Sequence, residues 1–569
     1  MTTVDRHDAG EHTPAGGGIE TFAASTLLGG LGVALAPRAL GRAAAATVRN
    51  PAPFVGGIAR LTGRLAAVAL TGRDEGVEAL DNRFADPAWH GNPLFHRLAA
   101  GYLTICDATM AAVDELDVDW RVREQVRMSV DNALALAAPT NNMLLNPQVW
   151  KEILDTGGAS VIRGAQHVLA DWRTPAKLPA SVDRSGFALG STIAATPGKV
   201  VRRETLYELI EYAPLTDTVD AIPTLIIASP VNKFYLVDLA PERSVIAAEL
   251  RAGRRVFVVS WVNPDRTHAD SGFDDYAAAV VEAMETACRI VGSTSCHPMG
   301  LCGGGQLTLL AAAYLASTGR QHLMATLTIA IAVVDFSGEP SGSAYIDRAT
   351  VGRAIQKARK AGHFNAVDTA RSFALLRPVD GIWHPVVHRY LLGRAAPRHD
   401  LLFWAADQTN MSAQFGADML TAALDNSFAV PDRAVVCGVP VDAGKISVPT
   451  YVLGASTDHI SPWHDCYRTV AMIGDNAEFT LATGGHAAAI AKGPGSKRAS
   501  YHTGGPAFGV DADTWLSRSE QRSGSWWEHW NEWIARHAPE TVAAPDSAGS
   551  AEFPPIDDAP GHYVRRVLT

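Results

Sequence analysis

A cysteine set among glycines constrains the fold of this chain more than any other feature. Residues 299–306 read Met-Gly-Leu-Cys-Gly-Gly-Gly-Gln. A short run from Val291 to His297 precedes them, and text rich in Leu and Ala follows as far as Ala316. A strand, a glycine-crowded bend and a helix, with a nucleophile at the bend, form a nucleophile elbow, usually written Gly-x-Ser-x-Gly. Cys302 takes the serine position in this chain.

The glycines have a steric role at such an elbow. The sharp bend strains the backbone of the nucleophile, and side chains at Gly300 and Gly304 would collide with neighbouring elements. The bend also leaves the Cys302 thiol exposed at a helix N-terminus, where the helix dipole favours the thiolate. The alternative interpretation is a glycine-rich turn that holds a buried, inert cysteine.

Several other short apolar runs, separated by segments with helical periodicity, accompany the elbow. Such runs are typical of strands buried on both faces of a parallel sheet. Besides the elbow strand, they occupy residues 224–228, 256–260, 448–453 and 477–481. The alternation predicts a doubly wound α/β sheet, and the elbow makes it an α/β-hydrolase fold. The alternation stops at about 336–440, where we expect a cap insertion that shields acyl intermediates from water.

Four segments are expected along the 569 residues. In residues 1–80, stretches rich in Gly and Ala alternate with stretches that contain scattered Arg. We interpret this segment as a mobile N-terminal arm. Residues 81–195 predict a mostly helical N-terminal domain. Residues 196–540 form the expected catalytic domain, and residues 541–569, rich in Pro, Ala and Asp, an extended C-terminal tail.

The bulk composition narrows the possible locations and partners. The net charge is -10 and no basic face stands out, so nucleic acid is not an expected partner. The six cysteines form no CxxC pair and have no metal-like spacing, which predicts reduced thiols and no metal site. The first apolar run, Phe22 to Ala36, is too short and glycine-rich to span a bilayer, and acidic residues precede it. We therefore expect a cytoplasmic protein without a signal peptide or transmembrane segment.

Two further residues stand where this fold places catalytic groups. Its triads run nucleophile, acid and histidine in chain order, on loops that follow strands. Asp458 follows the run 448–453, and His486 follows the run 477–481. Taken singly, Asp458 reads equally well as a helix cap and His486 as a surface loop residue. Their order after Cys302 predicts a triad.

An oxyanion hole on this fold needs two backbone N–H donors. We expect one from Gly303, the residue after the nucleophile. The other is expected from Val231, in the loop after the first buried strand.

These residues together resemble the polyhydroxyalkanoate synthases, the polymerases of poly(3-hydroxybutyrate) and related polyesters. The family's box, Gly-x-Cys-x-Gly-Gly, matches Gly300 to Gly305, and the chain length is similar to the single-subunit class I type. Further matching segments lie at 84–89, 92–95, 138–141, 196–201, 230–235, 260–264 and 403–407. Two residues depart from the expected pattern: Pro298 falls in the elbow strand, and Gly303 replaces a β-branched residue.

The resemblance implies an acyltransferase that polymerises (R)-3-hydroxyacyl-CoA and releases CoA, through a cysteine acyl-enzyme. The coenzyme A thioester is the substrate, and no cofactor is implied. A homodimer at the surface of polyester granules is implied as well. Trp404, within the family-like segment 403–407, and His459, beside Asp458, are the expected substrate-binding residues.

Two other functions would fit parts of this pattern. A thioesterase or intracellular polyester depolymerase would use the same triad with water as the acceptor. A non-catalytic granule-associated protein could keep the fold without the chemistry. The helical N-terminal domain and the breadth of the resemblance favour the polymerase. The sequence leaves open whether Asp458 orients His486 or activates the incoming hydroxyl.

Overall fold

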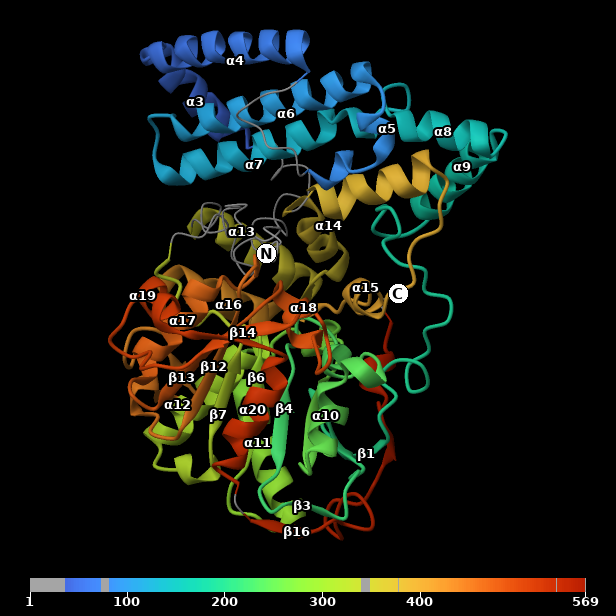
Figure 1. The fold of residues 1–569 in the computed structure, drawn as a ribbon. Coiled ribbons are helices and arrows are strands. Elements are labelled where there is room, and N and C mark those ends of the chain that lie inside the picture. The colour runs from blue at the N-terminus through green and yellow to red at the C-terminus, as the bar shows by residue number, and fades with distance from the viewer. Residues whose placement is uncertain (1–35, 73–80, 339–347, 377, 539, 568–569) are drawn as a thin grey trace, which may run out of the picture.

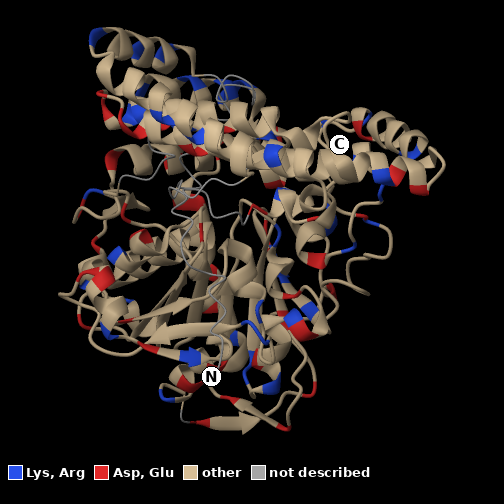
Figure 2. Ribbon diagram, turned by 45° about the horizontal axis from the view of Figure 1, so that its top comes forward, with Lys and Arg blue, Asp and Glu red and all other residues tan. Residues whose placement is uncertain are grey.

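The computed structural model describes residues 36–72, 81–338, 348–376, 378–538 and 540–567. Figure 1 shows a helical layer above a large α/β domain. The segment that connects β7 (Leu327–Ala330) to β12 (Thr450–Ala455) supplies helices that lie between the two. Figure 2 shows Lys and Arg interspersed with Asp and Glu over both layers, so neither sign of charge is confined to one of them.

An 11-stranded sheet forms the centre of the α/β domain. Its order is β15 (Glu520–Ser523), β14 (Ser500–Thr503), β13 (Ala477–Ala482), β12, β7, β6 (His297–Leu301), β4 (Thr224–Ile227), β5 (Val256–Trp261), β2 (Tyr207–Tyr212), β1 (Gly198–Arg203) and β17 (Asp557–Asp558). The six strands from β13 to β5 are parallel, and the flanking strands are antiparallel. This arrangement is the predicted α/β-hydrolase fold, with the strand β6 near the middle.

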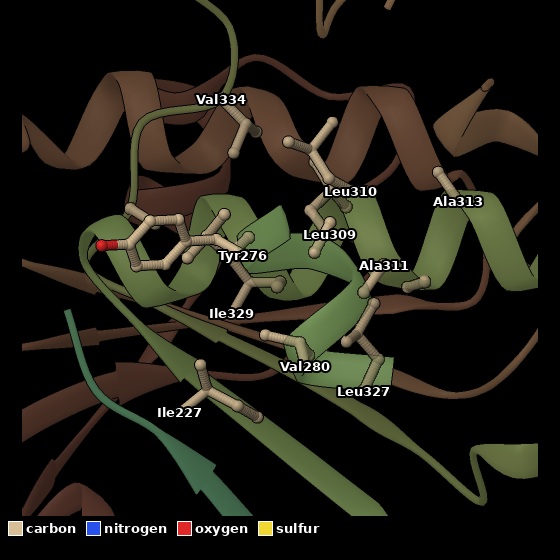
Figure 3. Close-up of a cluster of buried hydrophobic side chains, with 14 of the residues drawn as sticks. Ile227, Tyr276, Val280, Leu309, Leu310, Ala311, Ala313, Leu327, Ile329 and Val334 are labelled. Atoms are coloured by element: carbon tan, nitrogen blue, oxygen red, sulfur yellow. The ribbon is translucent and has the colours of Figure 1, made fainter. Parts of the chain in front are cut away.

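Helices cover both faces of the sheet because successive strand residues point to opposite sides. In β4, Leu225 and Ile227 belong to one buried cluster and Ile226 to the other. The first cluster, part of which is drawn in Figure 3, packs under α11 (Phe273–Val291), α12 (Gly303–Ser317), α17 (Trp463–Ile473) and α19 (Ala512–Arg518). The second packs under α10 (Val245–Arg251), α18 (His486–Ala491) and α20 (Trp526–Ala535). Short 3-10 helices connect these elements: η3 (Phe234–Val237), η4 (Pro241–Arg243), η5 (Arg266–His268), η6 (Gln321–Leu323) and η10 (Ala443–Lys445).

The elbow strand begins later than the sequence predicted. Val291 is the last residue of α11, and Gly292 ends that helix with a left-handed backbone (φ 80°). The strand β6 therefore starts at His297 and runs into the glycine box itself. The N–H of His297 donates to the carbonyl of Pro223, the residue before β4. The backbone nitrogen of Pro298, which carries no hydrogen, therefore faces β7, and proline is tolerated there. The ladder with β7 starts only at the next residue, Met299.

The helical layer includes residues that the sequence placed in an arm. Its elements are α3 (Pro37–Arg49), α4 (Ala52–Thr71), η1 (Asn82–Phe84), α5 (Pro87–His90), α6 (Pro93–Asp114), α7 (Trp120–Ala137), η2 (Pro139–Asn141), α8 (Pro147–Asp155) and α9 (Ala159–Trp172). Two ion pairs hold α4 on this layer: Arg60 with Glu115 (3.1 Å) and Arg64 with Asp107 (2.7 Å). Residues 36–72 of the expected arm are thus helical, whereas residues 1–35 and 73–80 lie outside the described residues.

One described helix, α4, is long and apolar enough to cross a membrane. Its 18-residue window has a mean hydropathy of 1.3, and 6% of that window is buried. Length and composition are the only support for a span. The expectation of no transmembrane segment rests on the run at 22–36 alone and does not take account of α4.

The segment between β7 and β12 is mainly helical. It contains α13 (Arg348–Ala361), β8 (His363–Phe364), α14 (Ala366–Leu376), the π-helices η8 (Val379–Trp383) and η9 (Val386–Leu391), α15 (Asp400–Ala406), β9 (Met411–Ser412), α16 (Ala413–Asp425), β10 (Val435–Val436) and β11 (Val439–Pro440). The helix α9 of the helical layer packs closely on η9. A Cβ at Gly164 would overlap the Tyr390 carbonyl, and Arg389 Nε lies 2.6 Å from Asp171 Oδ2.

The C-terminal segment folds back on the α/β domain. Its strand β16 (Thr541–Ala543) pairs with β3 (Thr218–Asp220), and β17 pairs with the edge strand β1. The buried Glu208 carboxylate on β2 accepts hydrogen bonds from the N–H groups of His562 and Tyr563, where η11 (Tyr563–Arg565) begins. The expected tail thus adds the edge strand β17 to the large sheet and forms a separate two-stranded sheet with β3.

Candidate active site

Cys302 occupies a strained backbone position between β6 and α12. Its φ and ψ are 53° and −123°, which a residue with a side chain rarely adopts. Hydrogen bonds from Cys302 N to the Ala330 carbonyl (2.9 Å) and from Gly305 N to the Cys302 carbonyl (2.8 Å) hold the bend. The elbow predicted from the sequence is present.

The two motif glycines leave room for neighbouring backbone. A Cβ at Gly300 would overlap the Thr308 hydroxyl, and a Cβ at Gly304 would overlap the carbonyl oxygens of Ile227 and Ala228. The predicted collisions are confirmed, and their partners are α12 and the end of β4.

Asp458 lies buried in the loop after β12, held from two sides. Its Oδ1 accepts hydrogen bonds from the N–H groups of Ile460 and Ser461, each at 2.8 Å. Its Oδ2 lies 2.7 Å from His486 Nδ1. The carboxylate therefore has a fixed orientation toward the imidazole.

His486 stands at the start of α18, in the loop after the adjacent strand β13. The two loops are tied together by hydrogen bonds from Ser456 N to the Ala482 carbonyl (2.8 Å) and from Thr457 N to the Gly484 carbonyl (3.0 Å). Because Asp458 takes Nδ1, Nε2 remains for the hydrogen bond that His486 makes with Cys302. The structure thus brings Cys302, Asp458 and His486 together.

The charges of these groups shift each other's protonation. Burial on its own raises the pKa of the Cys302 thiol, but the positive charge of His486, its hydrogen bond and a hydrogen bond from the Gly303 N–H lower that pKa below its usual value. Burial on its own lowers the pKa of His486, but Asp458 and Cys302 raise it well above its usual value. Both shifts favour a thiolate beside an imidazolium.

The two expected oxyanion donors lie on facing segments. A Cβ built at Gly303 would be 3.7 Å from Val231 Cγ2, so the loop after β4 packs on the start of α12. The Val231 N–H donates to the Ser229 hydroxyl at 3.3 Å. The Gly303 N–H points to the Cys302 sulfur.

The expected substrate-binding residues have different settings. Trp404, on α15, donates from Nε1 to the Lys233 carbonyl at 2.8 Å, at the end of the Val231 loop. His459 is half-buried beside Asp458. Among the residues that the structure describes, no group of three His, Cys, Asp or Glu is placed to hold a metal ion.

A buried ion pair next to this loop is a feature that the sequence did not predict. Lys233 Nζ lies 2.9 Å from Asp407 Oδ1, and the Tyr235 hydroxyl donates to Asp407 Oδ2 at 2.8 Å. Both partners stand in the family-like segments 230–235 and 403–407. Opposite charges in the two segments, a lysine in one and an aspartate in the other, could have suggested that the segments contact each other.

Comparisons of the sequence with a family model and with curated proteins agree on one family. Residues 80–248 match the family model described as "Poly-beta-hydroxybutyrate polymerase (PhaC) N-terminus". "Poly(3-hydroxyalkanoate) polymerase 2" of Ectopseudomonas oleovorans is 34% identical over 91% of this chain and 92% of its own. "Poly(3-hydroxyalkanoate) polymerase subunit PhaC" of Cupriavidus necator is 34% identical over 85% of this chain and 83% of its own. Among solved structures, a thioesterase domain from the curacin biosynthetic pathway covers 52% of this chain at 11% identity and a TM-score of 0.31.

Proposed function

This chain belongs to the poly(3-hydroxyalkanoate) polymerase family, and on that premise we propose that it polymerises (R)-3-hydroxyacyl groups from their CoA thioesters, with release of CoA, through an acyl-enzyme on Cys302. The observation that carries the mechanism is the contact of Cys302 with His486, which Asp458 holds at 2.7 Å. In this arrangement Cys302 supplies the thiolate, and His486, whose orientation Asp458 fixes, carries the proton.

Acylation begins with attack of the Cys302 thiolate on the thioester carbonyl. The carbonyl oxygen becomes an oxyanion near the N–H groups of Gly303 and Val231. Collapse of this intermediate breaks the bond to the CoA sulfur, and His486 gives its proton to the departing thiolate. Elongation reverses the proton's direction: His486 accepts the proton of the 3-hydroxyl group that attacks the acyl-enzyme.

Cysteine suits this reaction for an energetic reason. Attack of a thiolate on a thioester exchanges one thioester for another at nearly equal free energy. The acyl group on Cys302 stays activated, so its transfer to an alcohol runs downhill. A serine would convert it early to an ordinary ester and lose that driving force.

The location and the partners of the enzyme are part of the same proposal. We propose a cytoplasmic homodimer that acts at the surface of polyester inclusions and requires no cofactor. Exposed apolar side chains on α8 and α9 support contact with an apolar surface: Trp150, Leu154, Ile162, Leu169 and Trp172. The helices between the two layers, the expected cap, would admit substrate, exclude water and release the polymer.

Removal of the nucleophile tests the proposal directly. We expect Cys302→Ala to give neither CoA from 3-hydroxybutyryl-CoA nor turbidity from polymer, while its thermal melting stays that of wild type. Cys302→Ser should retain little activity, because a hydroxyl is far less acidic than a thiol. CoA release and turbidity are followed in one cuvette, since release without turbidity would identify a thioesterase. A tenth of the wild-type rate in Cys302→Ala would show that another residue is the nucleophile.

A further inference from the structure

The Ser229 hydroxyl lies between the two expected oxyanion donors. It accepts the Val231 N–H at 3.3 Å. On its other side is Gly303, where a Cβ would stand 2.8 Å from Ser229 Oγ, closer than to any other atom outside its chain neighbours. The hydroxyl therefore lies at the end of β4, against the residue that follows the nucleophile.

The hydroxyl has a proton that is not otherwise used. As an acceptor it takes the Val231 N–H, and in the part of the chain that the structure describes no acceptor for its own proton is found. A hydroxyl carries one donor besides its acceptor lone pairs. We propose that Ser229 donates this proton as a third hydrogen bond to the oxyanion formed on the substrate carbonyl, beside the N–H groups of Gly303 and Val231.

Gly303 makes this position possible. A side chain at residue 303 would enter the space that the Ser229 hydroxyl occupies, because the separation of 2.8 Å is shorter than carbon–oxygen contacts allow. On this proposal, glycine replaces the expected β-branched residue at position 303 because the Ser229 hydroxyl needs that space. The two residues act as a pair.

The role fits the acyl transfer step, and it rests on the proposed function. A bond forms between the Cys302 sulfur and the carbonyl carbon, and the π electrons move to the oxygen. Ser229 donates a hydrogen bond to that oxygen and keeps its proton. The Val231 N–H can turn to the same oxygen, since its bond to Ser229 is long and weak. When the CoA sulfur leaves, the negative charge returns to the carbonyl and Ser229 is unchanged.

The experiment compares two reactions of the same cysteine. Acylation by 3-hydroxybutyryl-CoA forms an oxyanion, whereas alkylation by iodoacetamide is a displacement at carbon that forms none. In Ser229→Ala we expect single-turnover CoA release to slow by about 10²-fold, the usual effect of removing one oxyanion donor. Alkylation of Cys302, followed by mass analysis of its peptide, should keep the wild-type rate.

A double-mutant cycle of Ser229→Ala and Gly303→Ala tests the pairing of the two residues. It provides a second measurement besides the rate of Ser229→Ala alone. Gly303→Ala should slow acylation in the wild-type background, where the new methyl group displaces the hydroxyl. In the Ser229→Ala background the same change should cost much less, so the two effects are not additive. Additive losses would overturn the pairing.

Three outcomes overturn the role of Ser229. Equal losses of acylation and alkylation in Ser229→Ala would identify a structural role. An unchanged acylation rate would show that the hydroxyl does not contact the oxyanion. A faster rate would show that it only occupies the Val231 N–H. Failure of the proposed function is recognised separately, because Cys302→Ala would then still release CoA or the wild-type protein would release CoA without turbidity.

Discussion

The pKa shifts of Cys302 and His486 both favour transfer of one proton from the thiol to the imidazole. The lowered thiol pKa keeps a thiolate at pH values where a free cysteine, with a pKa near 9.0, is protonated. His486 contributes this effect through its charge and its hydrogen bond. In the proposed mechanism, both shifts therefore favour the attacking thiolate before substrate arrives.

Loss of His486 should move the reactivity of Cys302 to higher pH. In His486→Gln the thiol loses the imidazolium that lowers its pKa, while burial, which raises it, remains. We expect the rate of Cys302 alkylation by iodoacetamide to rise with pH in both proteins, with the midpoint of the variant shifted upward. At pH 7 the variant should react more slowly, and well above both midpoints the rates should converge. Coinciding profiles would show that His486 does not set the thiol pKa.

The contacts of Asp458 favour the orienting role over activation of the hydroxyl. In Asp458→Asn the amide oxygen should keep the N–H groups of Ile460 and Ser461, which leaves the NH₂ group facing His486 Nδ1. The imidazole proton is then forced to Nε2, toward the thiol, and His486 cannot accept a proton there. We expect acylation of Cys302 to slow by about 10²–10⁴-fold.

Single-turnover CoA release and protein mass analysis distinguish the two roles of Asp458. One equivalent of CoA with a short chain trapped on Cys302 would assign Asp458 to elongation instead. Asp458→Glu is the matched variant, since it retains the charge while moving the carboxylate.

Much of this site follows from sequence because strand ends meet at one edge of a parallel sheet. That rule alone brings the loops of Asp458 and His486 next to the elbow of Cys302. It says nothing of Ser229, whose relation to Gly303 depends on how closely the end of β4 approaches α12. Packing sets that distance, and no sequence pattern predicts it.

At the scale of elements, the ion pair of Lys233 and Asp407 joins α15 to the loop that carries Val231. Both side chains are nearly buried, with 3% and 12% of their surfaces exposed. Burial lowers the pKa of Lys233, and Asp407 opposes that shift. The loop and the helix therefore hold each other in place across a gap of 174 positions.

Removal of Asp407's charge should destabilise the protein in a pH-dependent way. Asp407→Asn leaves a buried ammonium group unpaired, which typically costs about 3–5 kcal/mol. The folded-state pKa of Lys233, already below 10.5, then falls further. The folded state releases that proton more readily than the unfolded chain, so the stability deficit should shrink as pH rises toward 10.5. Urea unfolding at several pH values measures this.

The double variant Lys233→Met/Asp407→Leu is the control for the unpaired charge. It should recover part of the lost stability, because neither buried charge remains, while the Tyr235 hydroxyl loses its acceptor. A deficit in Asp407→Asn that does not change with pH would contradict the account.

Element boundaries were harder to predict than element types. Val291 reads as a strand residue because it is β-branched, yet Gly292 provides the left-handed end of α11. The glycines at 56, 57 and 63 lower the helix propensity of α4. That helix forms against α6, where Leu65 lies next to Gly101 and two ion pairs form. Tertiary contacts of this kind override local propensity.

At the scale of the whole molecule, the helical layer stands apart from the site chemistry. The helices α3 and α4 pack on α7 and α6, not on the sheet. Deleting residues 1–75 removes both and cuts the chain before η1. The deleted α4 also carries exposed apolar side chains, among them Phe54, Val55 and Leu70. We therefore expect binding to isolated polyester granules to weaken, although α8 and α9 remain, with single-turnover acylation of Cys302 nearly unchanged.

Sedimentation with granules and mass analysis of the acyl-enzyme measure the two properties of this deletion separately. Granule binding that persists while acylation is lost would reverse the assignment.

The pairing of β1 with β17 has a consequence for how the protein is made. Lys199 and Asp558, opposite each other in this pair, are 359 positions apart. On the ribosome β1 is therefore finished long before its partner exists, and its outer N–H and C=O groups form an open edge throughout that interval. Neighbouring nascent chains on one messenger present the same edge to each other. We expect rapid synthesis to favour their association, and slow synthesis or a chaperone that covers the edge to favour soluble protein.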